Sequence, residues 1–115
     1  MSYDLRIGVK VEGLGKIVCI GSPDLDEPTY NLGKMFRECT DWDFEQGEWY
    51  NCKEVLPKIR YGLMMLATAT NYYRQYEPEN GWGTVETAKA TLHSLHDCIT
   101  DWAEIIPLEH LWVRW

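Results

Sequence analysis

The sequence predicts a single α+β domain in which a small antiparallel sheet packs against helices on one side. Apolar and polar residues alternate near the N-terminus, two central segments carry apolar residues at helical spacing, and the last residues alternate again. The expected order is ββαααβ: an N-terminal hairpin and a C-terminal strand form a three-stranded antiparallel sheet against about three helices. With 115 residues, the chain has the length of one domain, residues 1–115, and can bury a stable core without disulfide bonds or a structural metal ion.

The first twenty residues are expected to form a β-hairpin. Every second residue from Tyr3 to Val11 is apolar, so one face of this strand is apolar. Gly13 and Gly15 supply turn residues that tolerate positive φ, and the run 16–20 is the returning strand. Two strands alone are marginal in water, so the alternating residues 111–115 are expected to complete the sheet.

A loop and a short helix are expected after the hairpin. Residues 21–30 contain Pro23 and Pro28, which block regular pairing. A short helix is expected to start between residues 29 and 31 and to end near Cys39. Residues 40–50 are predicted to be irregular.

Two long helices are expected in the second half of the chain. Asn51, with Glu54 three residues later, resembles a capping box, while Pro57 predicts either a kink or a later start of that helix. The other helix is expected from about Thr84 to Ile106. Apolar or partly apolar residues at helical spacing form the buried stripe of the first of these helices: Leu56, Ile59, Leu63, Leu66, Thr70 and Tyr73.

Composition narrows the function classes. The net charge of −7 disfavours direct binding of nucleic acid, because the chain would repel a polyanion. No apolar run approaches the ~20 residues of a membrane span, and the polar N-terminus does not resemble a signal peptide, so we expect a cytoplasmic protein. The four cysteines form no C-x-x-C pair and are expected to be reduced and mostly buried.

The sequence offers no clear catalytic or metal motif. His93 and His96 share a helix face, but the only other imidazole is that of His110, so we expect two ordinary histidines and no metal. No G-x-S-x-G elbow is present, and Gly13-Leu14-Gly15 is followed by a strand rather than a helix. A non-enzymatic protein without a cofactor is therefore expected.

The negative charge is concentrated in residues 24–54. This segment holds nine acids and three bases, and so carries six of the seven net negative charges. In one interpretation the acids solvate a loop while the aromatic residues fill the core. In the other, the segment is an interface whose acids face a basic partner and whose aromatic residues anchor it. The expected partner-binding residues are Asp24, Asp26, Glu27, Asp41, Trp42, Asp43, Glu45, Glu48 and Trp49.

The string Asn80-Gly81-Trp82-Gly83 is a second unusual feature. Its glycines permit a tight turn that places a large ring at a defined position. The Trp82 ring is expected either to pack against the core and so fix the loop in place, or to stack on a planar ligand. In the second case Asn80, Trp82 and Thr84 are the possible ligand-binding residues, with the helix start as an anion site.

Three segments, Pro28–Arg37, Leu56–Leu63 and Glu77–Thr84, resemble small uncharacterised proteins of bacteriophages and prophages. The strongest element is Asn80-Gly81-Trp82-Gly83-Thr84 at the start of a helix. The resemblance brings no known activity, but it implies a phage-type origin. Short acidic proteins of that origin are similar to anti-CRISPR proteins, which occupy basic nucleic-acid grooves.

The resulting expectation is a non-enzymatic inhibitor of a host nucleic-acid-processing defence protein. It would act in the host cytoplasm through an acidic aromatic surface that mimics nucleic acid. A CRISPR effector is one such partner. Two alternatives remain open: a protein that binds a small nucleotide signal, and a phage structural or assembly protein.

Overall fold

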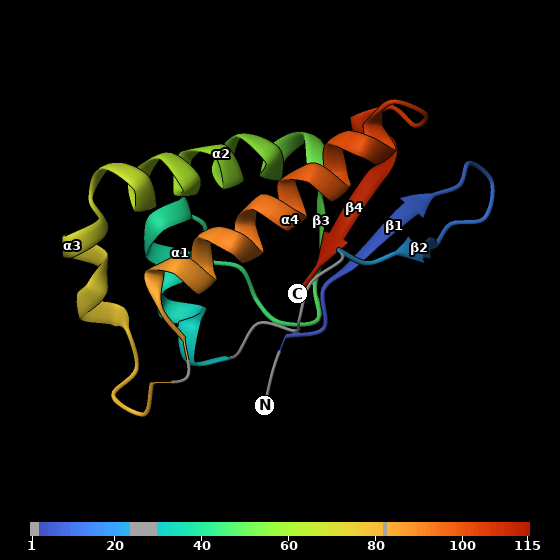
Figure 1. Cartoon of the computed structure of the whole chain (residues 1–115). Coiled ribbons are helices and arrows are strands. Elements are labelled where there is room, and N and C mark those ends of the chain that lie inside the picture. Colours follow the sequence, from blue (N-terminus) through green and yellow to red (C-terminus); the bar gives the residue numbers. More distant parts are fainter. Residues whose placement is uncertain (1–2, 24–29, 82) are drawn as a thin grey trace.

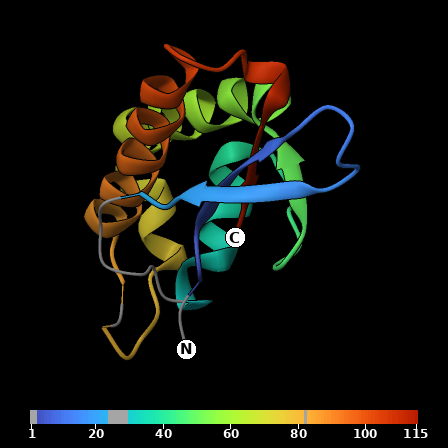
Figure 2. The ribbon, with the colours of Figure 1, turned by 90° about the vertical axis from the view of Figure 1, so that its right-hand side faces the viewer.

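The computed structural model describes residues 3–23, 30–81 and 83–115 and confirms the α+β class. This part of the chain holds a four-stranded antiparallel sheet of order β2-β1-β4-β3 and four α-helices, of which α2 and α4 contact the sheet (Figure 1). Helices α2 and α4 run beside one another, and the β1–β2 hairpin projects beyond them. In Figure 2, β2 crosses the front of the sheet and α4 lies to its left.

The hairpin and the terminal strand form as expected. Strands β1 (Arg6–Lys10) and β2 (Ile17–Gly21) pair antiparallel. Gly13 and Gly15 take φ values of 89° and 67° in the connecting turn, a region that glycine enters at little cost. Strand β4 (Leu111–Arg114) then pairs with β1 on its other side.

The expected three strands and three helices are wrong in two places. A fourth strand, β3 (Trp49–Asn51), pairs with β4 at the edge of the sheet. Its three residues are too few to show a period, and only the distant β4 defines it. Ala69, at φ −125° and ψ 40°, separates a short helix α3 (Thr70–Tyr73) from the long one. The observed order of strands and α-helices is therefore ββαβαααβ.

The short helix is confirmed as a single 3-10 turn (Tyr30–Leu32) followed by α1 (Gly33–Thr40). Residues 24–29, most of the predicted loop, lie outside the described residues. Two further 3-10 turns, Arg74–Tyr76 and Leu108–His110, follow α3 and α4.

The two long helices start where their caps predict. In α2 (Cys52–Thr68), Asn51 Oδ1 accepts a hydrogen bond from the Lys53 N–H at 3.0 Å. The helix continues through Pro57, so the alternative of a later start is wrong. In α4 (Val85–Ala103), Thr84 Oγ1 accepts from the Thr87 N–H at 3.1 Å. This helix ends three residues before the expected Ile106.

One core joins the helices to the sheet. It includes Ile7, Leu111 and Val113 from the strands, each fully buried, together with the apolar faces of α1, α2 and α4. The terminal Trp115 lies at its centre and stacks on Phe44 with ring centroids 4.3 Å apart. The final aromatic side chain of the sequence thus ties the 40–50 segment to the sheet.

All four cysteines are free thiols. Cys39 and Cys52 are buried, and burial raises the pKa of each thiol to about 12. Cys98 is half-buried, and Cys19 is exposed on β2. The expectation of mostly buried thiols thus fails for Cys19.

Candidate interaction surface

The segment from Asp41 to Glu45 alternates strictly between solvent and core. Asp41, Asp43 and Glu45 are exposed, whereas Trp42 and Phe44 expose 7% and 1% of their surface. The three acids therefore face solvent, and the two aromatic residues between them face the core. We call this segment, extended to Glu48, the acidic loop.

Hydrogen bonds hold the acidic loop in place. Asp41 ends α1 in the left-handed region, at φ 51°, and the Trp42 N–H donates to the Arg37 carbonyl at 3.2 Å. Arg37 Nε donates to the Phe44 carbonyl at 3.0 Å, and its guanidinium lies 4.3 Å from the centre of the Phe44 ring. The Glu45 N–H donates to the Tyr50 hydroxyl at 2.8 Å. The carboxylates therefore project from an ordered support.

The two tryptophans expected to anchor a partner are not projecting side chains. Trp42 packs edge-on against Tyr50, at 5.0 Å between ring centres, and lies 6.0 Å from Trp115. Trp49 is half-buried on the sheet, beneath the guanidinium of Arg114. For Trp42 the core interpretation is the correct one, because its ring completes the aromatic cluster and has little surface left for a partner.

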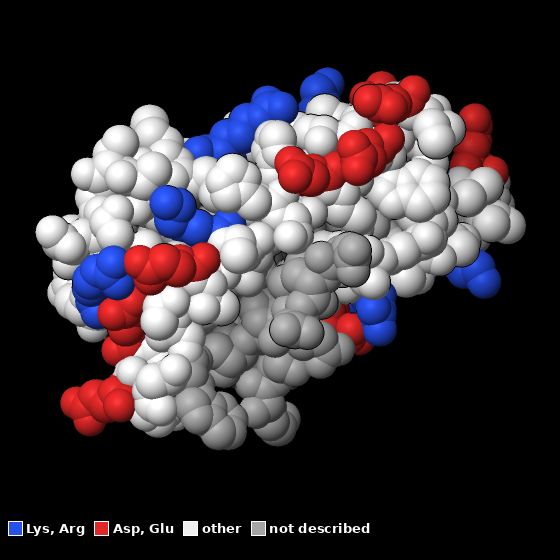
Figure 3. Space-filling view, viewed as in Figure 1, with Lys and Arg blue, Asp and Glu red and all other residues white. Residues whose placement is uncertain are grey.

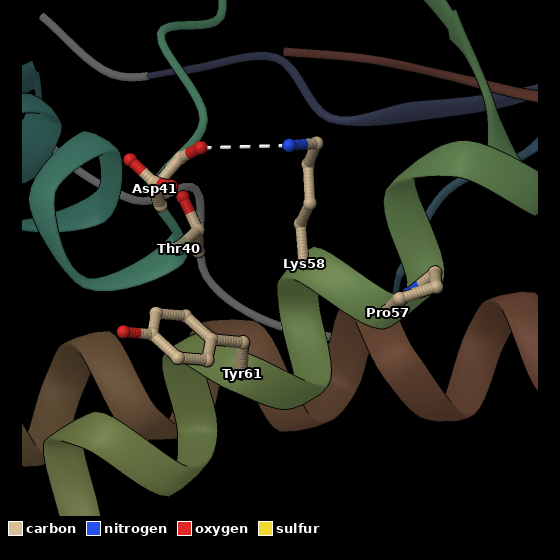
Figure 4. A pocket seen from close by; sticks show the side chains of 5 residues that line it. All are labelled: Thr40, Asp41, Pro57, Lys58 and Tyr61. Carbon is tan, nitrogen blue, oxygen red and sulfur yellow. Dashed lines mark hydrogen bonds between the residues drawn. The ribbon is translucent and has the colours of Figure 1, made fainter.

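A hollow of about 350 Å³ opens beside Asp41, between the end of α1 and the outer face of α2 (Figure 4). Thr40, Asp41, Pro57, Lys58 and Tyr61 line it. Lys58 Nζ donates to the main-chain carbonyl of Asp41 at 3.5 Å, so this ammonium does not pair directly with the carboxylate. The ring of Tyr61 is 43% exposed and supplies the aromatic surface that Trp42 does not.

Two cations lie close to the acidic loop. Arg37 Nε is 3.8 Å from the Asp43 carboxylate, whose side chain is fully exposed, and Lys58 lies beside Asp41. An ion pair with so exposed an acid contributes little free energy. The two cations nevertheless make the local excess of negative charge smaller than the sequence indicated.

Of the remaining acids of the predicted interface, the structure describes Glu48. Glu48 is exposed at the end of the acidic loop. Asp24, Asp26 and Glu27 lie outside the described residues.

A second acidic surface was not predicted. Asp97 and Asp101 on α4 and Glu104, which caps its C-terminal end, are exposed and spaced three or four residues apart, and Figure 3 shows acidic side chains along the C-terminal half of this helix. Ile105, 77% exposed, lies beside them and borders a hollow of about 260 Å³. We call the three acids the α4 ridge. From Ala90 to Val113 the chain has four acids and no lysine or arginine, a signal that was present in the sequence.

The helix start proposed as an anion site already holds a carboxylate. Glu77 Oε2 accepts from the Val85 N–H at 2.8 Å and pairs with Arg74 at 3.1 Å. Thr84 Oγ1 occupies the Thr87 N–H. Asn80 is exposed in the preceding turn, and Trp82 lies outside the described residues. A nucleotide phosphate would have to displace a paired acid here.

Neither histidine of α4 belongs to a metal-binding group in the described part of the chain, where no cluster of three His, Cys, Asp or Glu residues is arranged to hold an ion. His93 is exposed, and His96 accepts from Arg60 and contacts Asp97 at 3.1 Å. Among the described helices, none is long and apolar enough to cross a membrane.

Comparisons with protein-family models, with curated proteins and with solved structures find no match.

Proposed function

We propose that this chain is a non-enzymatic, phage-type inhibitor that binds a basic, nucleic-acid-processing defence protein in the host cytoplasm. The observation that carries the proposal is the row formed by Asp41, Asp43 and Glu45, held outward by buried aromatic residues and placed beside the exposed ring of Tyr61. A CRISPR effector, whose nucleic-acid channel is positively charged, is the first class of partner to test.

The hollow beside Asp41 suits the side chain of an arginine. The Asp41 carboxylate and the C-terminal end of α1 both favour a cation, and the Tyr61 ring offers a face for a guanidinium. Lys58 occupies part of this environment through one long hydrogen bond, which an incoming guanidinium would replace. Such a contact combines charge with aromatic burial, as at the centre of many interfaces.

The rest of the acidic loop would steer the partner. We expect it to raise the association rate and fix the orientation, while the Tyr61 hollow contributes most of the affinity.

The α4 ridge is the competing surface and provides a matched control. It offers three acids, as many as the row Asp41, Asp43 and Glu45, but its exposed neighbour is the aliphatic Ile105 rather than a tyrosine. Tyrosine is enriched among the residues that dominate binding energy, which favours the acidic loop.

The experiment measures DNA cleavage by a panel of guide-loaded CRISPR nucleases with and without this protein. Two triple variants are compared, Asp41→Asn/Asp43→Asn/Glu45→Gln in the loop and Asp97→Asn/Asp101→Asn/Glu104→Gln on α4. We expect the original chain and the α4 variant to inhibit a member of the panel. The loop variant should inhibit that nuclease at least tenfold more weakly, with an unchanged circular dichroism spectrum. Inhibition of no panel member, or equal loss in both variants, contradicts the proposal. Self-assembly of the isolated chain would favour a structural protein, and stabilisation by a nucleotide would favour a ligand-binding protein.

A further inference from the structure

The face of the sheet turned away from the helices carries a different chemistry from the rest of the molecule. Ile7, Leu111 and Val113 point into the core, so the alternate residues of β1 and β4 point to the opposite face. These residues are Arg6, Gly8, Lys10, Trp112 and Arg114. A Cβ on Gly8 would meet Ile17 Cγ2 at 2.5 Å and the Trp49 ring at 2.9 Å. Trp49 and Ile17 therefore lie on the same face, across Gly8.

Each tryptophan of this outer face is paired with a cation. Arg114 Cζ lies 4.9 Å from the centre of the Trp49 ring, and Lys10 Nζ lies 5.8 Å from that of Trp112. The register places Trp49 opposite Arg114 on adjacent strands. Trp112, two residues before Arg114 on β4, is thus the diagonal neighbour of Trp49, at about 7–8 Å between backbone positions. Two ring–cation stacks stand side by side on the sheet.

The outer face is cationic although the chain is acidic. It holds Arg6, Lys10 and Arg114, and the acid found paired with these cations is Asp4, 2.9 Å from Arg6. The indole N–H of Trp112 is buried and has no hydrogen-bond partner among the described residues. A buried donor without a partner is costly, so a ligand oxygen that accepted a hydrogen bond from it would be stabilising.

We propose that the outer face binds single-stranded nucleic acid. Bases stack on aromatic rings and on guanidinium planes, so a base can extend the Arg114–Trp49 stack without displacing it. Lys10, over the Trp112 ring, and Arg6 then lie on the same face as the Arg114–Trp49 stack, where phosphates need neutralisation. An acidic peptide would use the cations, but its carboxylates have no aromatic face to stack on the rings. This inference uses neither the acidic loop nor Tyr61, so it does not depend on the proposed function.

The net charge of −7 weakens such binding without excluding it, and this revises the expectation from composition alone. At physiological salt, charges beyond about 8 Å are largely screened, so the groups on the outer face decide the contact. Three cations that each neutralise one phosphate give a slope of about −2 for log affinity against log salt. A rise from about 50 to about 200 mM salt should thus weaken binding about twentyfold.

The test is fluorescence anisotropy of a labelled oligothymidylate of about fifteen nucleotides, titrated with the full chain at both salt concentrations. The variant Lys10→Gln/Arg114→Gln should bind at least tenfold more weakly and lower the salt slope to about −0.7. The control Lys34→Gln/Lys89→Gln removes the same charge from α1 and α4 and should bind as the original chain does. Trp49→Leu should also lose about tenfold through stacking.

Several results would overturn the inference: no binding at the lower salt concentration, equal loss in both charge variants, or equal competition by polyglutamate. The last result would identify a surface for acidic polypeptides instead. Circular dichroism of each variant separates loss of binding from loss of folding, and the Lys10/Arg114 variant keeps the test valid if Trp49→Leu does not fold.

Discussion

Arg37 connects the acidic loop to α1, and its replacement should loosen the loop without altering a single carboxylate. Its Nε–H reaches the Phe44 carbonyl at 3.0 Å, and its guanidinium covers the Phe44 ring at 4.3 Å. Arg37→Met keeps the aliphatic stem and removes both contacts. Arg37→Lys keeps the charge but loses the planar donor, so it separates charge from geometry.

The expected loss of folding free energy in Arg37→Met follows from these contacts. A hydrogen bond from a charged donor contributes about 1.5–3 kcal/mol, and we take the low end because the Arg37 side chain is 32% exposed. The cation–π contact adds about 0.5 kcal/mol, and the pair with the fully exposed Asp43 adds about nothing. A total of about 2 kcal/mol corresponds to a fall of about 8 °C in Tm for a chain of 115 residues.

Thermal unfolding followed by circular dichroism measures this shift, and hydrogen exchange of the amides of residues 43–48 measures the loosening. Arg37→Met should lower Tm by about 8 °C and speed exchange in this segment. The Tm of Arg37→Lys should lie closer to that of Arg37→Met than to that of the original chain. A Tm within about 2 °C of the original for Arg37→Met, with unchanged exchange, would refute the claim that Arg37 supports the loop.

Three further outcomes are expected. Gly62→Ala should destabilise the chain by about 1–3 kcal/mol in a urea melt despite the better helix propensity of alanine, because the new Cβ would lie 2.6 Å from Thr40 Cγ2; an equal or higher stability would contradict this packing. With a thiol reagent, Cys19 should react in the native state, and Cys39 and Cys52 should react only after unfolding. The free energy of unfolding should also fall as the pH rises from 9.0 toward 12, because the Cys39 and Cys52 thiols ionise at lower pH in the unfolded chain than in the folded one. A free energy of unfolding that stays constant over this pH range would be inconsistent with the burial of the two thiols. Arg74 lowers the pKa of Glu86 from 4.5 to about 2, so this pair stabilises the fold above pH 4.5 and the effect is lost as the pH falls toward 2; Glu86→Gln should remove that part of the acid profile, and an unchanged profile would count against the pair.

The parts of the fold that local patterns specify were predictable. The hairpin, both long helices and the terminal strand follow from apolar periods and caps such as Asn51 and Thr84. Strand β3 was not predictable, because its three residues carry no period and are defined by pairing with Arg114, Val113 and Trp112 far along the chain.

The candidate site was predictable only in part. The alternation Asp-Trp-Asp-Phe-Glu over residues 41–45 already separates the acids from the aromatic residues, and it could have placed Trp42 in the core. Tyr61 lies opposite the buried stripe of α2, but its proximity to Asp41 requires the packing of α1 on α2. The outer face of the sheet depends on strand order, which no local pattern shows.

Hydrogen exchange of the chain in complex with the nuclease it inhibits tests the central claim most directly. The account expects slower exchange on binding in residues 41–48 and in the part of α2 around Tyr61, with residues 97–105 unchanged. Protection confined to the α4 ridge, or to the outer face of the sheet, would contradict it.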